Sequence, residues 1–206
     1  MSDSTYEFSE TKAPLECYEW DRTWIAHTED KETRRIFYVG DSISWDGIRG
    51  AMQNIVGSEF YIDALATSKA LDNLYLLPML DLMLRQIQKP KLMLFNNGLH
   101  GWHLDDEKEY PVLLERLLRY LTETYHVSVA VVLTTRVKDP QRNLRVNVRN
   151  REAAAVAEKL NLPVIDLYCP SEEYASLQKE DGVHFSREGY NALAKSILGQ
   201  IRNLLA

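Results

Sequence analysis

A serine, an aspartate and a histidine are spaced as nucleophilic catalysis requires. Ser42 follows Gly40 and Asp41 at the end of a short apolar run, and Asp181 precedes His184 by three residues. A carboxylate at that spacing on a tight loop can bond to the imidazole Nδ1, which fixes the tautomer and leaves Nε2 to accept the proton of a serine. The chain order Ser, Asp, His is that of one known class of catalytic triad. These residue types predict acyl transfer through a covalent serine intermediate.

Both motifs also have an ordinary structural explanation. A serine after Gly-Asp can be the N-cap of a helix, and an aspartate close to a histidine often occurs by chance. Position favours chemistry, because Ser42 follows the first predicted strand and His184 follows the last. A helix that begins near Ser42 would also offer free N–H groups and a partial positive charge to an oxyanion.

The elements that must position these residues alternate from residue 35 onward. Apolar runs predict strands, and amphipathic patterns predict helices, over the following ranges: strands 36–40, 59–66, 91–97, 127–135 and 163–167, and helices 71–88, 111–125, 147–160 and 186–205. This alternation predicts an α/β fold, a three-layer doubly wound sheet of about five parallel strands. Such sheets bind ligands beyond the carboxyl ends of their strands, which is where both motifs lie.

Local signals refine these elements. Pro78 predicts a kink in its helix, Pro111 suits the first turn of the next one, and Ser186 is a natural N-cap for the last. Residues 23–27 are a candidate for a short edge strand. We expect residues 1–34 to form an N-terminal arm that packs on a single domain made of residues 35–206.

Composition excludes several classes of protein. The 206 residues carry a net charge of −6, which disfavours a nucleic-acid binder. The longest apolar run, from Val129 to Leu133, is far below the roughly 20 residues of a membrane span. Cys17 and Cys169 make neither a disulfide framework nor a zinc site. The first twelve residues contain no apolar signal-peptide core. The localisation stays open: cytoplasmic for the sequence as it stands, and secreted or periplasmic if a signal was removed.

Together, Gly40-Asp41-Ser42 and Asp181-x-x-His184 resemble the SGNH, or GDSL-type, hydrolase family, from about residue 35 to the C terminus. The resemblance implies a flavodoxin-like fold and ester hydrolysis without a cofactor or a metal. It also implies that Ser42 is the nucleophile, His184 the base and Asp181 its partner. No Gly-x-Ser-x-Gly motif is present, which argues against the nucleophile elbow of the α/β-hydrolases.

The middle motifs of that family are altered in this chain. The resemblance implies an oxyanion hole to which Ser42 contributes its N–H. We expect a second donor in the N–H of Ser68, where the family usually has glycine. The family's Gly-x-Asn-Asp aligns with Gly98-Leu99-His100-Gly101, which makes His100 the preferred third donor and leaves Asn97 as the alternative. A neutral imidazole N–H can donate to an oxyanion as an amide does.

Other residues near these turns are candidates for substrate binding. Trp45 and Trp102 are either core residues or stacking platforms for a sugar ring, and His103 is a candidate for a rim or substrate contact. Arg142 could hold a substrate carboxylate or phosphate. The alternative for Arg142 is a solvated basic face that it forms with three other arginines (Arg136, Arg145 and Arg149). A metal between His100 and His103, near Asp105 and Asp106, is the less favoured reading.

The sequence therefore predicts a serine esterase for small acyl esters, with O-acetyl groups on carbohydrate as the preferred substrate. The same site would also suit an acyltransferase or a lysophospholipase-like thioesterase. A third alternative is a non-catalytic carbohydrate-binding relative, which only the altered middle motifs favour. The expected partner is a small-molecule or carbohydrate ester, and neither a nucleic acid nor a membrane span is expected.

Overall fold

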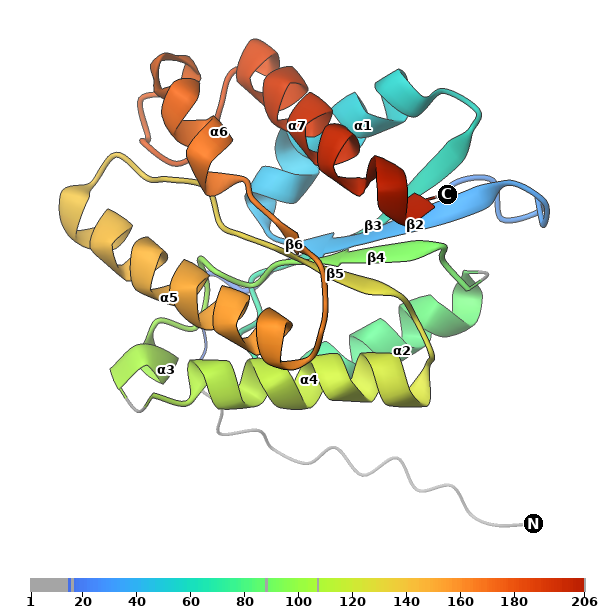
Figure 1. Cartoon of the computed structure of the whole chain (residues 1–206), viewed down its shortest axis with the longest axis horizontal. Helices are drawn as coiled ribbons and strands as arrows, with labels where there is room; N and C mark the ends of the chain where they lie inside the picture. The colour runs from blue at the N-terminus through green and yellow to red at the C-terminus, as the bar shows by residue number, and fades with distance from the viewer. Residues whose placement is uncertain (1–14, 16, 88, 107, 206) are drawn as a thin grey trace.

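A central sheet covered by helices on both faces organises the molecule (Figure 1). The structure is a computed structural model, and it describes residues 15, 17–87, 89–106 and 108–205. The sheet has six strands in the order β1-β3-β2-β4-β5-β6. Their bounds are β1 (Asp21–Trp24), β2 (Arg34–Gly40), β3 (Phe60–Thr67), β4 (Leu92–Phe95), β5 (Val129–Val132) and β6 (Val164–Ile165).

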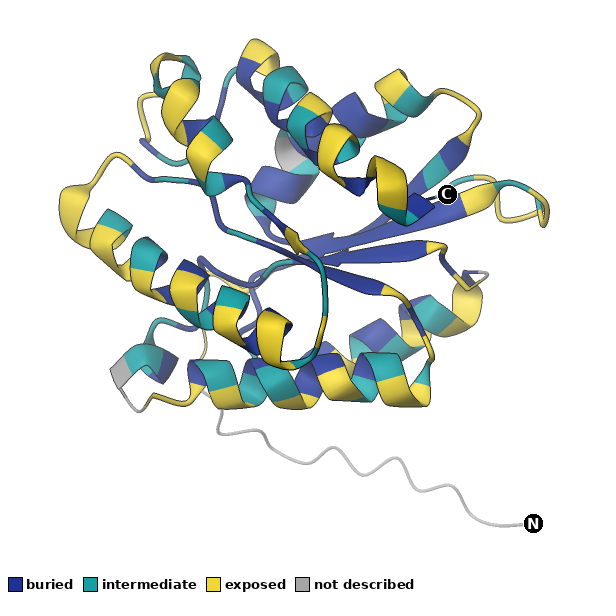
Figure 2. Cartoon of the chain, viewed as in Figure 1, coloured by how far each residue is buried: buried dark blue, intermediate teal, exposed yellow. Residues whose placement is uncertain are grey.

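The five strands from β3 to β6 are parallel, which confirms the predicted doubly wound α/β fold. Their apolar runs are buried on both faces, as expected when helices cover a parallel sheet (Figure 2). β1 is the exception, because it pairs antiparallel with β3 at the edge of the sheet. The expected edge strand at 23–27 therefore begins two residues earlier, at Asp21.

Helices form the two outer layers. One face carries α1 (Arg49–Val56), α6 (Tyr168–Glu173) and α7 (Arg187–Leu205), and the other carries α2 (Leu76–Gln86), α3 (His103–Asp106), α4 (Tyr110–Thr124) and α5 (Pro140–Lys159) (Figure 1). Each layer has its own apolar core. Ile36 of β2 packs toward α1 and α7, whereas the next residue, Phe37, packs toward α2 and α4. This alternation of side chains along one strand joins the three layers.

Two of the predicted helices begin several residues away from their predicted first residues, and the other two differ by one residue. α5 begins at Pro140, because the Asp139 carboxylate caps it by accepting a bond from the Arg142 N–H at 2.7 Å. α2 begins only at Leu76, so Pro78 lies in its first turn, where proline is tolerated, and the predicted kink is wrong. Ser186 precedes α7, and its Oγ accepts a bond from the Gly189 N–H at 3.3 Å, as the prediction of an N-cap requires.

The described part of the predicted arm is tied to the sheet through Arg35, which forms a buried ion pair between β2 and β3. Arg35 Nη1 lies 2.9 Å from Asp63 Oδ2, and both side chains are nearly inaccessible. Arg35 also donates to the carbonyl oxygens of Ala26 and His27, so it fixes the segment that leads from β1 into β2. Residues 1–14 lie outside the described residues, and the division into arm and domain stays a prediction. No helix in the described ranges has the length and apolar character needed to cross a membrane.

Candidate active site

Two loops at the carboxyl ends of the sheet bring the predicted triad together. Ser42 follows β2, and His184 lies just before α7. His184 Nε2 is 2.8 Å from Ser42 Oγ, and His184 Nδ1 is 2.9 Å from Asp181 Oδ2. Both distances are within hydrogen-bond range, and each ring nitrogen has a different partner. This is the geometry by which a histidine takes the proton of a serine while a carboxylate orients the ring.

The Asp181 carboxylate is held in its charged form. Partial burial raises the pKa of Asp181, but the N–H groups of Val183 and His184 and the His184 ring outweigh it and lower the pKa to about 2. The two N–H groups bond to Oδ1 at 2.8 and 2.9 Å, which leaves Oδ2 for the imidazole. Because these bonds come from within one tight loop, the three-residue spacing itself builds the acceptor for the histidine.

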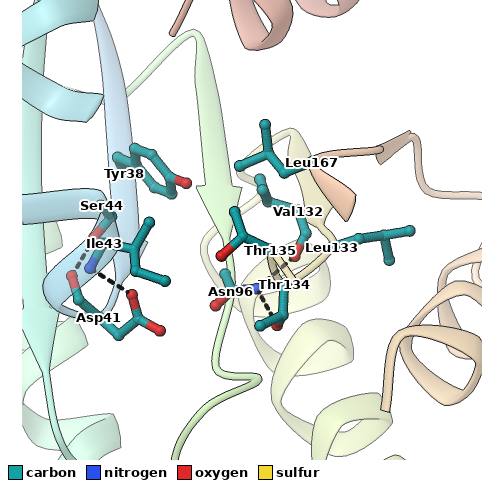
Figure 3. A pocket seen from close by; sticks show the side chains of 10 residues that line it. All are labelled: Tyr38, Asp41, Ile43, Ser44, Asn96, Val132, Leu133, Thr134, Thr135 and Leu167. Carbon is teal, nitrogen blue, oxygen red and sulfur yellow. Dashed lines mark hydrogen bonds between the residues drawn. The ribbon is translucent and has the colours of Figure 1, made fainter. Parts of the chain in front are cut away.

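A sharp turn presents Ser42, the predicted nucleophile. Asp41 Oδ1 accepts a bond from the Ile43 N–H at 2.9 Å, and the Asp41 carbonyl accepts one from Ser44 Oγ at 2.7 Å (Figure 3). A helix therefore starts directly at Ser42, with a π-helical segment η1 at Ser44–Ile48 that continues into α1. A Cβ at Gly40 would lie 2.6 Å from Ser44 Oγ, so only glycine allows this turn to close.

A small pocket lies behind that turn, between the ends of β2 and β5 (Figure 3). The side chains of Tyr38 and Asp41 face it from one side, and those of Thr134 and Thr135 from the other. Burial and the charge of Asp41 raise the pKa of the Tyr38 hydroxyl, so Tyr38 stays neutral at physiological pH. A neutral phenol is a poor general base, so Tyr38 does not compete with the predicted role of His184 as the base.

The two asparagines after β4 have different partners. Asn96 Nδ2 donates to the Val132 carbonyl at 2.7 Å and to Thr134 Oγ1 at 3.0 Å, which accounts for both of its hydrogens. Asn97 Nδ2 donates to the carbonyl of Lys69 at 2.8 Å. Because β2 lies between β3 and β4, this bond crosses the end of β2, where Ser42 emerges. The second hydrogen of Asn97 Nδ2 is therefore a candidate donor to an oxyanion.

The predicted role of Ser68 does not fit the structure. Its backbone N–H donates to the carbonyl of Trp20 at 3.1 Å, and its Oγ accepts a bond from the Trp20 N–H at 2.9 Å. Both groups are thus occupied by the segment that leads into β1. We correct that prediction, because a donor already bonded to a backbone carbonyl is not available to an oxyanion.

His100 lies in a turn that a buried arginine supports. Arg149 donates to the carbonyls of His100 and Gly101, and its Nε lies 2.6 Å from Asp105 Oδ1. The His100 ring meets the Trp20 ring edge to face, with centroids 6.2 Å apart. Arg149 is almost fully buried, so it is not part of the solvated basic face that we predicted. The proposed donor role of His100 stays a prediction.

The other candidates for substrate binding are dispersed around the rim. Trp102 packs against the core, and Arg145 and Arg149 each lie 4.7 Å from its ring centroid. Trp45 is half-buried on η1, one turn after Ser42. Arg142 is exposed in the first turn of α5. The substrate roles of these residues stay predictions.

The carboxylates near His103 have partners of their own. His103 Nε2 lies 2.8 Å from Asp72 Oδ2, and Asp105 pairs with Arg145 and Arg149. Nowhere among the described residues do three or more His, Cys, Asp or Glu side chains gather as metal ligands would. The Asp106 side chain lies outside the described part.

The model of the GDSL-like lipase/acylhydrolase family matches residues 36–197. The chain belongs to this family. The match begins in β2 and runs through Ser42 and His184 into α7, so it includes both loops of the predicted triad. This GDSL-like protein is a serine ester hydrolase, and the resemblance seen in its sequence is confirmed. A search of curated proteins finds no match.

Solved structures share the fold of this GDSL-like protein at low sequence identity. LAE5, an alpha/beta hydrolase from the metagenome of Lake Arreo, is 15% identical with a TM-score of 0.64, covering 84% of this chain and 96% of its own. Inhibitor-bound aryl esterase of M. smegmatis is 16% identical with a TM-score of 0.64, at 84% and 100% coverage. Axe2, an acetylxylan esterase from Geobacillus stearothermophilus, is 19% identical with a TM-score of 0.59, at 82% and 94% coverage.

Sequence reasoning missed residues that act through distant contacts. Trp20 occupies the Ser68 N–H from 48 positions away, and Lys69 Nζ lies 2.6 Å from Asp21 Oδ2. Neither contact has a local signal, because both join the start of β1 and the residue before it to the loop after β3. The burial of Arg149 was likewise hidden, because arginines in helices usually face solvent.

Proposed function

We propose that this GDSL-like protein hydrolyses small acyl esters, with O-acetyl groups on carbohydrate as its preferred substrates, through a covalent intermediate on Ser42. The observation that carries the proposal is the continuous relay from Ser42 Oγ through the His184 ring to Asp181, with separations of 2.8 and 2.9 Å. The His184 side chain is 25% exposed, so solvent and substrate can reach the relay.

The first half of the reaction forms the acyl-enzyme. Ser42 Oγ attacks the carbonyl carbon of the ester while His184 Nε2 takes the hydroxyl proton. The tetrahedral oxygen is stabilised by the N–H of Ser42 at the start of its helix and by the Asn97 side-chain amide. His100 is the alternative donor. His184 then gives its proton to the leaving alcohol oxygen as the carbon–oxygen bond breaks.

The second half releases the acid. His184 takes a proton from water, the resulting hydroxide attacks the acyl carbon, and the proton returns to Ser42 Oγ as the acid leaves. The charged carboxylate of Asp181 stabilises the imidazolium in both halves. No cofactor is needed for these proton transfers.

Two features support a carbohydrate ester. Trp45 lies one helical turn from Ser42, where an indole ring could stack on a sugar. Among the structural neighbours, Axe2 and AlAXEase are described as acetylxylan esterases, at 19% and 16% identity. The Trp102 ring packs against the core and is the weaker candidate for such a platform.

Labelling with a fluorophosphonate probe tests the nucleophile. We expect the wild type to be labelled and Ser42→Ala to be unlabelled, with p-nitrophenyl acetate hydrolysis lost in parallel. Ser44→Ala is the matched control, because its hydroxyl lies on the same turn but bonds to the Asp41 carbonyl. Labelling of Ser42→Ala would refute the assignment. Turnover of acetylated xylo-oligosaccharides that depends on an added sugar acceptor would indicate acyl transfer instead of hydrolysis.

A further inference from the structure

Arg49, the first residue of α1, is held between two indole rings. Its guanidinium carbon lies 4.9 Å from the centroid of Trp24 on β1 and 5.6 Å from that of Trp45 on η1. The two rings come from segments that are distant in the sequence, so the stack joins the edge strand to the helix that carries the nucleophile. Rings at this distance stabilise a cation by electrostatic attraction.

The charge of Arg49 has no acidic partner within the described part of the chain. No described carboxylate forms an ion pair or a hydrogen bond with it, and its buried Nε atom has no hydrogen-bond partner. Partial burial lowers the pKa of Arg49, and the charge of Asp63 offsets this only in part. A half-buried arginine that lacks a carboxylate is unusual, because buried charges are normally paired.

Two adjoining cavities share Arg49 in their lining. One, of about 400 Å³, is also lined by Trp45, Lys179 and Arg187. The other, of about 490 Å³, is also lined by Trp24 of β1 and Gln53 of α1. No aspartate or glutamate is among the described residues that line either cavity. In a chain with a net charge of −6, a hollow whose described lining residues include three cations and no acid is a local site for an anion.

The first cavity borders the catalytic loops. Trp45 follows Ser42 by three residues, and Arg187 follows His184 by three. The Lys179 N–H donates to the His184 carbonyl at 2.8 Å, which ties the cavity wall to the catalytic loop. Arg49 itself is seven residues beyond Ser42, or roughly 10 Å along a helix. An ester group at Ser42 and an anionic group at Arg49 could therefore belong to one substrate.

We propose that Arg49 binds a carboxylate of the substrate, so that the preferred ester is an acylated sugar derivative that carries a uronic acid. The guanidinium lies near both indole rings, and no described carboxylate bonds to it, so its Nη N–H groups are candidate donors to a ligand. A planar carboxylate accepts two such bonds side by side, whereas a lysine offers only a point charge. Lys179 and Arg187 add long-range attraction. This inference rests on the proposed esterase function.

Binding of a sugar that contains no ester tests the site apart from catalysis. Methyl β-glucuronoside, methyl β-glucoside and glucose 6-phosphate are titrated into the protein while tryptophan fluorescence is recorded. We expect the glucuronoside to bind more tightly than the other two. Arg49→Gln should weaken its binding 10-fold or more, and Arg49→Lys should restore only part of it. Arg116→Gln, an exposed arginine on α4, is the matched control and should bind as the wild type does.

Kinetics then connect the site to the reaction. The ratio of kcat/KM for acetylated methyl glucuronoside over acetylated methyl glucoside should fall 10-fold or more in Arg49→Gln, mainly through KM, and should fall in the wild type as salt is added. A purely structural role for Arg49 would change both substrates equally. Equal glucuronoside affinity in wild type and Arg49→Gln, or tighter binding of glucose 6-phosphate, overturns the proposal. If the wild type binds the glucuronoside but does not hydrolyse p-nitrophenyl acetate, the esterase proposal fails and the anion site stands.

Discussion

The side-chain amide of Asn97 donates to the carbonyl oxygen of Lys69 across the end of β2, at a distance of 2.8 Å. It thereby links the loops that follow β3 and β4. These two strands flank β2, which ends just before Ser42. Asn97 is buried, so water does not compete for this bond. The amide is fixed before any substrate arrives, which is what effective stabilisation of an oxyanion requires.

Replacing Asn97 separates the two candidates for the oxyanion donor. We expect Asn97→Ala to lower kcat for p-nitrophenyl acetate by about 10² to 10³, the usual cost of one such donor. His100→Ala should lower it less than 10-fold. Thermal unfolding of both variants controls for loss of the buried bond to Lys69. If only His100→Ala loses activity, the imidazole is the donor and Asn97 supports structure alone.

Asp181 gives a prediction with a defined pH window. Its pKa of about 2 in the folded protein lies below the usual aspartate value of 3.8, so its charged form stabilises the fold at pH values above about 4. That contribution is lost as the pH falls from about 4 to about 2. We expect the difference in Tm between the wild type and Asp181→Asn to be full at neutral pH and to vanish near pH 2. A difference that stays constant over this range contradicts the role of the N–H bonds.

The same substitution should reduce activity at every pH at which the enzyme works. Asp181→Asn keeps the shape of the side chain but loses the charge that stabilises the imidazolium, so kcat should fall by about 10⁴. Asp166→Asn is a control, because Asp166 caps the turn at Tyr168, away from the triad, through a bond of 2.8 Å. Similar kcat values for Asp181→Asn and Asp166→Asn would mean that a group other than Asp181 orients His184.

The sequence predicted the features that have local signals. β-branched apolar runs marked the parallel strands, and the Gly-Asp-Ser and Asp-x-x-His motifs each define a loop whose geometry depends on a few consecutive residues. The carboxylate of Asp181 illustrates this, because its bonds come from Val183 and His184. Topology then brings the two loops to one edge of the sheet without further information.

Contacts between distant segments could not be predicted in this way. Whether the N–H of Ser68 is available to an oxyanion depends on the carbonyl of Trp20, which accepts its hydrogen bond. The two groups are adjacent because β1 pairs with β3. The orientation of Arg49 between two indoles depends on that same pairing. The start of α5 at Pro140 does have a local signal, because Asp139-Pro140 is a typical helix cap. The prediction placed the start later because it relied on the spacing of apolar residues alone.

The buried pair of Arg35 and Asp63 predicts a large effect on stability. Arg35→Met leaves the Asp63 carboxylate buried without its cation, which typically costs about 3 to 5 kcal/mol of unfolding free energy. The double variant Arg35→Met/Asp63→Leu removes both charges and should recover much of that loss. Urea unfolding of the two variants measures the difference. A loss below about 1 kcal/mol in Arg35→Met would show that water reaches the carboxylate.

Two glycines, one in η1 and one at the start of α1, give a paired test of how α7 packs on this helix. A Cβ at Gly47 would lie 2.0 Å from ring atoms of Tyr190, whereas a Cβ at Gly50 meets nothing within 4 Å. Gly47→Ala must push α7 away, so we expect a loss of about 1 to 3 kcal/mol in unfolding free energy. Gly50→Ala should gain about 0.5 to 1 kcal/mol, because alanine restricts the unfolded chain. Since α7 begins directly after the loop of His184, Gly47→Ala should also lower kcat. Equal stability of the two variants in denaturant unfolding would contradict the close contact between Gly47 and Tyr190.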